Sequence, residues 1–141
     1  MATRSTIAVE LANGTVHQVY CHWDGYVSHN GTLLNNHYNT QEQVEKLVSF
    51  GDMSCLGECI EPTTDAHSFE TREEGVTVYY GRDRDETDER IKTKVFESYD
   101  SYKTKFNREE YNYIFRNGKW FVAAAESRNE FVELETLISN S

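Results

Sequence analysis

The feature that most constrains the fold is an Asn-Gly dipeptide between two runs of alternating apolar residues near the end of the chain. Both residues accept the positive φ angles of a two-residue turn, so this pattern is the strongest short signal for a β-hairpin. It occurs at Asn117-Gly118, with aromatic and β-branched side chains on both arms. The segment 111–124 is therefore predicted to form two antiparallel strands joined by a tight turn.

The same dipeptide occurs at Asn13-Gly14, where it predicts a second hairpin. Alternating apolar residues precede it from 7 to 11, and a return strand follows it from 15 to 23. A two-residue turn at this point pairs Arg4 with Trp23 at the open end of the hairpin, within reach of a cation–π contact.

Amphipathic spacing and capping residues predict the helices. Thr40 and Gln43 form a capping box, and Gly51 follows the apolar stripe where a C-terminal cap is expected. Ser127 and Glu130 form another capping box before an apolar stripe that ends at Ile138. The predicted helices are 32–38, 40–50, 98–106 and 127–138. Shorter strands are predicted at 76–80 and 91–96, with an irregular connection at 51–67 and a charged loop at 82–86.

These elements indicate the α+β class. We expect an antiparallel sheet built from the two Asn-Gly hairpins plus the additional strands, with helices packed on one face. A chain of 141 residues fits one ordinary domain, so residues 1–141 are predicted to form a single domain. Open sheet edges favour pairing into a homo-oligomer.

Composition restricts the classes of partner and of chemistry. The chain carries 24 acidic and 14 basic residues, a net charge of −10, which argues against general nucleic-acid binding. The apolar runs are too short for a membrane span, and the N-terminus carries no apolar signal region. Together with an odd number of cysteines, this predicts a reducing cytoplasm.

No metal, cofactor or catalytic role is expected from the motifs. Cys55 and Cys59 have a gap that zinc sites use, but no second close pair accompanies them, and buried thiols are the alternative for them and for Cys21. No phosphate-binding loop, nucleophile elbow or His-Glu-x-x-His helix occurs. We therefore predict a protein that is not an enzyme.

The loop after the first hairpin is the main candidate ligand site. It gathers ring faces, donors and acceptors at His22, Trp23, Asp24, Tyr26 and Asn30. Aromatic faces stack on nucleobases, and His, Asp and Asn side chains bind polar edges. The alternative is that Trp23 and Tyr26 are core anchors and that Asp24 belongs to a turn.

Other segments supply further candidates. Tyr113 adds a stacking face, and Arg4, Arg82 and Arg84 supply guanidinium groups that suit phosphate. The acidic residues around Arg82 and Arg84 favour the alternative that these two arginines pair with carboxylates on a solvated surface.

Several motifs resemble a widespread family of small proteins encoded by tailed bacteriophages. The most specific is Tyr20-Cys21-His22-Trp23-Asp24-Gly25-Tyr26, followed by His29-Asn30-Gly31. The others are Thr3-Arg4-Ser5-Thr6, the segment 51–57, Tyr80-Gly81-Arg82-Asp83-Arg84, Glu110-Tyr111-Asn112-Tyr113 and Asn117-Gly118-Lys119-Trp120.

This resemblance implies a phage accessory protein that acts in the host cytoplasm. Small phage proteins without enzyme motifs are often antagonists of host defence, and the chain is loosely similar to the first Thoeris anti-defence family. Members of that family sequester signalling nucleotides, including cyclic ADP-ribose isomers, without degrading them. The resemblance therefore implies an oligomeric sponge for a cyclic ADP-ribose isomer or a cyclic oligonucleotide.

The acidic charge supports an alternative function. A protein with net charge −10 suits an inhibitor directed at a basic host defence protein, including one that mimics DNA. The acidic residues between 83 and 89 are the best feature for this alternative, although the arginines among them weaken the negative field.

Overall fold

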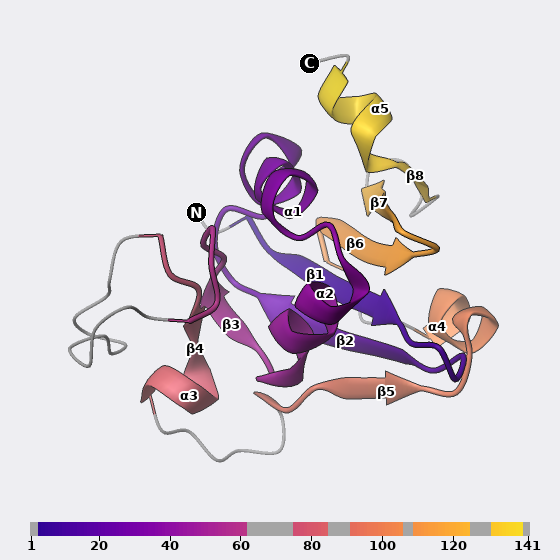
Figure 1. Ribbon diagram of the computed structural model, residues 1–141, viewed down its shortest axis with the longest axis horizontal. Helices are drawn as coiled ribbons and strands as arrows, with labels where there is room; N and C mark the ends of the chain where they lie inside the picture. The colour runs from indigo at the N-terminus through magenta and orange to yellow at the C-terminus, as the bar shows by residue number, and fades with distance from the viewer. Residues whose placement is uncertain (1–2, 62–74, 85–90, 106–108, 125–130, 140–141) are drawn as a thin grey trace.

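Two β-hairpins dock side by side through their first strands and form the centre of a mixed eight-stranded sheet (Figure 1). The computed structural model describes residues 3–61, 75–84, 91–105, 109–124 and 131–139. The strands are β1 (Ser5–Glu10), β2 (Val16–Cys21), β3 (Met53–Cys55), β4 (Val78–Tyr79), β5 (Lys94–Phe96), β6 (Tyr111–Arg116), β7 (Lys119–Ala124) and β8 (Val132–Glu133). The helices are α1 (Thr32–His37), α2 (Gln41–Ser49), α3 (Tyr80–Arg84), α4 (Tyr99–Lys105) and α5 (Leu134–Ser139), and a π-helical turn, η1 (Val27–Gly31), leads into α1.

The sheet confirms the α+β class but is not purely antiparallel. Its strand order is β4-β3-β2-β1-β6-β7-β8, and β5 pairs with the outer edge of β2 beside β3. The pairs β1–β6 and β2–β3 are parallel. The antiparallel sheet expected from the sequence is therefore wrong in this respect, because the hairpins meet through strands that run in the same direction.

The second hairpin forms as predicted. Arg116 pairs with Lys119 across a two-residue turn, with φ angles of 53° at Asn117 and 77° at Gly118. Positive φ at both central residues is the requirement that Asn-Gly meets best.

The first hairpin forms with a different register. The Gly14 amide donates to the Leu11 carbonyl at 2.9 Å, and the Leu11 amide donates to the Thr15 carbonyl at 2.8 Å. The loop therefore has three residues, with Gly14 at φ +88° as its left-handed member. Ser5 pairs with Cys21, so the predicted pairing of Arg4 with Trp23 is wrong by one residue.

One face of the sheet carries the main core beneath α1, α2 and α5 (Figure 1). Ile7 of β1 is fully buried in the same cluster as Leu34 of α1, Leu47 of α2 and Leu134 of α5. The capping box at the start of α2 is confirmed, because the Thr40 side chain accepts from the Gln43 amide at 3.2 Å.

The opposite face is covered by α4 over part of its area. Tyr102 of α4 is fully buried against Ala8, Val16 and Ile114, which belong to β1, β2 and β6. The expectation that helices pack on one face only is therefore wrong. Side chains that point to this second face alternate along each strand with those that point to the main core. Thr6 of β1 therefore lies on the same face as Ala8.

Three local predictions also need correction. Strand β3 lies inside the segment predicted to be irregular, and α3 replaces the first part of the predicted charged loop. The C-terminal helix begins at Leu134, because Val132 pairs with Val122 of β7 as part of β8. The capping box predicted at Ser127 and Glu130 lies outside the described residues.

Candidate functional site

A row of buried polar side chains crosses the sheet on the face that α4 covers only in part. The side chains of Thr6 in β1, Gln18 in β2 and Asn112 in β6 are 1%, 1% and 0% exposed. Thr6 Oγ1 donates to Asn112 Oδ1 at 2.8 Å, and Asn112 Nδ2 donates to the Glu109 carbonyl at 3.0 Å. Buried polar groups need such partners, and this row gives one end of the face a polar floor.

A cavity of about 320 Å³ lies over this floor. That volume is at the small end of the range for sites that bind small molecules. The lining residues are Thr6, Gln18, Val19, Tyr20, Asp52, Lys94 and Glu109.

Asp52 occupies a gap in the pairing of β2. Strand β5 pairs with Val16 to Gln18 and β3 pairs with Cys21, so the Tyr20 amide between them has no strand partner. That amide donates to Asp52 Oδ1 at 2.9 Å. The carboxylate of Asp52 therefore replaces a backbone carbonyl at this point of the sheet.

The backbone holds Asp52 in place from both sides. Its amide donates to the Ile91 carbonyl at 2.7 Å, and its carbonyl accepts from the Tyr80 amide at 3.2 Å. Asp52 is 6% exposed, and among the described residues no group donates to its second oxygen, Oδ2. Burial raises the pKa of this carboxyl to about 6, against the opposing effects of the Tyr20 amide and Lys94. Asp52 carried no signal in the sequence beyond its place after Gly51.

Replacing Asp52 with asparagine is expected to stabilise the protein at neutral pH. The raised pKa means that this carboxyl stabilises the fold below pH 4 and that the contribution is lost as the pH rises through about 6. Because a pKa unit corresponds to about 1.4 kcal/mol, Asp52→Asn should gain about 2 kcal/mol relative to the parent between pH 4 and pH 7. Urea unfolding at both pH values measures this difference. Asp100→Asn is the control, because that side chain is 93% exposed; an equal pH effect in both variants would contradict the assignment.

Tyr20, His22 and Trp23 form an aromatic rim beside the cavity. The Tyr20 hydroxyl and His22 Nδ1 are 2.7 Å apart, and the His22 and Trp23 rings meet edge to face with centroids 4.7 Å apart. Trp23 is 42% exposed, so its ring is accessible to a ligand. Burial raises the pKa of Tyr20 to about 12 against the nearby positive charge of Arg4, an exposed residue that immediately precedes β1.

The rest of the predicted loop site is divided between surface and interior. Asn30 is fully buried, and its Nδ2 donates to Ser5 Oγ at 3.3 Å and to Cys21 Sγ at 3.4 Å. Asp24 adopts φ +56°, and its carbonyl accepts from the Asn30 amide at 3.2 Å. Tyr26 is 37% exposed and packs against His29. Asn30 and Asp24 therefore shape the loop, whereas Tyr26 presents part of its ring to solvent.

Tyr113 does not offer the stacking face expected from the sequence. Its side chain is fully buried, and its hydroxyl donates to the Gly25 carbonyl at 2.6 Å. This bond ties the loop that contains Gly25 to β6. Tyr113 therefore positions the loop from below.

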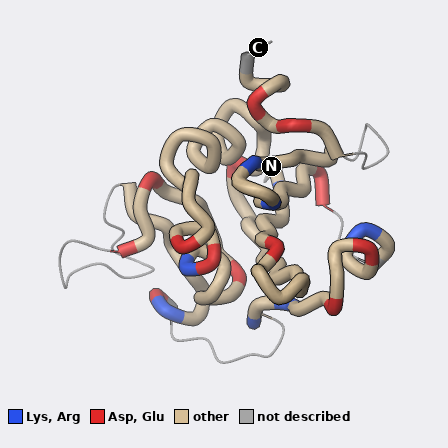
Figure 2. The backbone as a smooth tube through the Cα atoms, turned by 45° about the vertical axis from the view of Figure 1, so that its right-hand side comes forward, with Lys and Arg blue, Asp and Glu red and all other residues tan. Residues whose placement is uncertain are grey.

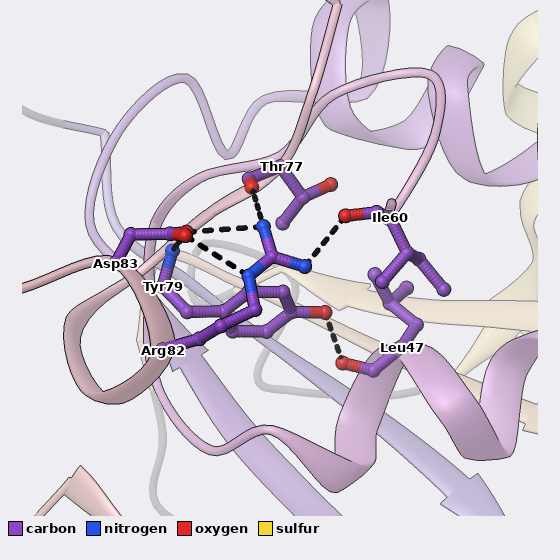
Figure 3. A network of polar contacts seen from close by, with 6 residues as sticks. All are labelled: Leu47, Ile60, Thr77, Tyr79, Arg82 and Asp83. Carbon is purple, nitrogen blue, oxygen red and sulfur yellow. Dashed lines mark hydrogen bonds and ion pairs between the residues drawn. The ribbon is translucent and has the colours of Figure 1, made fainter. Parts of the chain in front are cut away.

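Arg82 does not have the free guanidinium that a phosphate site requires (Figure 3). The guanidinium donates twice to the Asp83 carboxylate at 3.0 Å, to the Ile60 carbonyl at 2.6 Å and to the Thr77 carbonyl at 2.8 Å. It also lies over the Tyr79 ring, 4.8 Å from its centroid. The predicted pairing with a carboxylate is correct, but the side chain is only 19% exposed and the pair is not on a solvated surface.

The remaining candidates from the sequence are Arg84 and the cysteines. Arg84 ends α3, and its side chain lies outside what the structure describes. Among the described residues, no group of three or more His, Cys, Asp or Glu side chains is arranged to hold a metal ion. Cys21 is buried, and burial raises the pKa of its thiol to about 12.

A second cavity of about 290 Å³ lies between the end of α1, the second hairpin and the start of α5. Among the described residues, the lining of neither cavity includes a candidate residue from the sequence. Lys119 and Glu133 in the lining of the second cavity are 3.6 Å apart, and both side chains are largely exposed. The first cavity is the stronger candidate, because the Asp52 carboxylate lines it and Oδ2 of that group has no donor among the described residues.

Within the described part of the chain, no helix has the length and apolar character needed to cross a membrane. No family model, curated protein or solved structure matches the chain.

Proposed function

We propose that this protein binds a small nucleotide in the cavity above Thr6 and Gln18 and retains it without chemical change. The observation that carries the proposal is the Asp52 carboxylate, which lines a cavity with a polar floor and whose Oδ2 has no donor among the described residues. An acceptor in this position is available to a ligand that donates a hydrogen bond.

The surroundings of the cavity match the parts of a nucleotide. Trp23 offers an exposed ring face next to His22, which suits base stacking. Arg4 and Lys94 are the cations near the cavity, and they suit phosphate oxygens at its mouth. Thr6 and Glu109 add polar groups for ribose hydroxyls or the base edge.

Retention without turnover is supported by the state of the hydroxyl group of Tyr20, a residue that lines the cavity. Burial raises the pKa of Tyr20 to about 12, so this group is not ionised near neutral pH. With the resemblance to phage proteins, this favours a counter-defence sponge that removes a host immune signalling nucleotide in the host cytoplasm. Cyclic ADP-ribose isomers and cyclic oligonucleotides are the candidate ligands.

We also propose a homo-oligomer, as the resemblance implies. Val95 of β5 is 61% exposed and Val132 of β8 is 45% exposed, and both belong to short strands near open edges of the sheet. Such edges favour pairing with a second copy.

The alternative of an acidic inhibitor receives less support. The acidic residues in the described part are spread over separate elements (Figure 2). Asp83 is paired with Arg82, and residues 85–90 lie outside the described part.

A ligand panel tests the proposal. Purified protein is mixed with cyclic ADP-ribose isomers and with cyclic di- and trinucleotides, and its melting temperature is measured. A ligand at about 100 times its dissociation constant should add about 2.7 kcal/mol of stability, and intact ligand should be recovered after heating. Trp23→Ala and Arg4→Ala should each weaken binding, whereas Tyr26→Ala, which removes a ring packed on His29, is the matched control. Absence of any shift contradicts the proposal, and recovery of altered ligand indicates an enzyme.

A further inference from the structure

Two carboxylates, those of Asp52 and Glu109, line the cavity. Asp52 Oδ2 has no donor among the described residues, and no described group forms a hydrogen bond or ion pair with the carboxylate of Glu109, which also lines the cavity. Among the described residues, Lys94 is the only cation in the lining, and it forms no ion pair with Asp52 within 4 Å. A ligand group that enters this space is therefore favoured if it donates hydrogen bonds.

We propose that Asp52 selects the base of the bound nucleotide and that the cavity takes a guanine edge in preference to an adenine edge. This inference rests on the proposed function and specifies its ligand. Guanine presents two adjacent donors, N1–H and the N2 amino group. An ionised carboxylate only accepts, so it can receive both donors.

Adenine fits the same group poorly. Its edge presents one donor, the N6 amino group, beside one acceptor, N1. The lone pair of N1 would face a carboxylate oxygen, and the two repel each other. N6 could donate to Oδ2 while Oδ1 keeps the Tyr20 amide, so the discrimination against adenine comes from this repulsion.

Protonation of Asp52 should change this preference. The charged and titratable groups around it are Lys94 of β5, Glu109 before β6, Tyr20 of β2 and Tyr80 at the start of α3. Burial raises the pKa of Asp52 to about 6, so the carboxyl gains a proton over the mildly acidic range. A protonated carboxyl has one donor and one acceptor, which matches adenine. The preference for guanine should therefore weaken from pH 8 to pH 5.

The experiment compares nucleotides that differ only at this edge. Dissociation constants are measured for guanosine, inosine, xanthosine and adenosine monophosphates, and for cyclic di-GMP and cyclic di-AMP, at pH 8 and pH 5. The parent should bind guanosine monophosphate at least about tenfold more tightly than the inosine form, which lacks the N2 amino group, and than the adenosine form. Cyclic di-GMP should likewise have a lower dissociation constant than cyclic di-AMP.

Asp52→Asn provides the second arm, with Asp100→Asn as the matched control for loss of one negative charge. An asparagine amide donates to the C2 carbonyl of xanthine and accepts from its N1–H, so the variant should lose affinity for guanine and gain it for xanthine by about tenfold each. Equal binding of guanine and adenine nucleotides by the parent, or unchanged selectivity in Asp52→Asn, overturns this inference and leaves the proposed function standing. If no nucleotide binds the parent, both are overturned.

Discussion

Arg82→Ala is expected to lower the free energy of unfolding by about 3–5 kcal/mol, the usual loss when one partner of a buried ion pair is removed. The substitution removes the guanidinium that pairs with the Asp83 carboxylate, whose side chain is 5% exposed. It also removes the donors that satisfy the Ile60 and Thr77 carbonyls at 2.6 and 2.8 Å. Three buried acceptors are affected by one change, and urea unfolding measures the result.

Two comparisons separate this network from an ordinary charge effect. Arg82→Lys keeps the charge but cannot reach Asp83 and two carbonyls at once, so it should recover little of the loss. Lys46→Ala removes an ion pair with Glu61 that is shorter, at 2.6 Å, but whose side chains are 50% and 60% exposed. That loss should be much smaller, because exposed ion pairs contribute little to stability. If Arg82→Ala costs no more than Lys46→Ala, the network in Figure 3 does not stabilise the fold.

Short sequence motifs correctly predicted the elements that depend on interactions between residues close in the sequence. The turn at Asn117-Gly118 and the cap at Thr40 each depend on residues within a few positions. The dipeptide Asn13-Gly14 has the same sequence as Asn117-Gly118 but belongs to a three-residue loop. There Asn13 Oδ1 accepts from both the amide and the hydroxyl of Thr15, at 3.1 and 2.6 Å. That competing set of bonds is visible only when the side chain is placed.

The residues that line the cavity were not among the candidates from the sequence. His22 and Trp23 stand in one ring-rich loop, and the contact of His22 Nδ1 with the Tyr20 hydroxyl connects this loop to the lining. Asp52, Lys94 and Glu109 come from three distant segments. The pairing of β2 with β3 and β5 brings Asp52 and Lys94 together, and the pairing of β1 with β6 adds Glu109. No periodicity in the sequence marks such a convergence.

Other predicted ligand-binding residues do not offer free polar groups. The residue type alone does not show whether a polar side chain binds a ligand or another part of the protein. Arg82, Asn30 and Tyr113 each have the chemistry for nucleotide recognition, yet the backbone and neighbouring side chains already use their polar groups. Asp52 differs from them, because it lines the cavity and only one of its oxygens has a donor, the Tyr20 amide, among the described residues. Its position therefore depends on the backbone around it.

Gly51→Ala tests whether the backbone before Asp52 holds this residue in place. The free energy of unfolding is expected to fall by about 3 kcal/mol or more. Gly51 adopts φ +85°, which costs other residues about 1–2 kcal/mol. In addition, a Cβ atom at this position would lie 2.5 Å from the Ile91 carbonyl oxygen, the atom that accepts from the Asp52 amide. The backbone on one side must move, and the move carries Asp52 away from the Tyr20 amide.

Gly14→Ala separates the two causes, because Gly14 has φ +88° and a Cβ there would meet no atom within 4 Å. This control should lose only the conformational cost, about 1 kcal/mol. The excess loss in Gly51→Ala then measures the contact with Ile91. The same variant should also lose most of the pH dependence between pH 4 and pH 7 that Asp52 causes, since a displaced carboxyl is less buried and its pKa returns toward 3.8. Equal losses in the two glycine variants would mean that this contact does not hold Asp52 at the cavity.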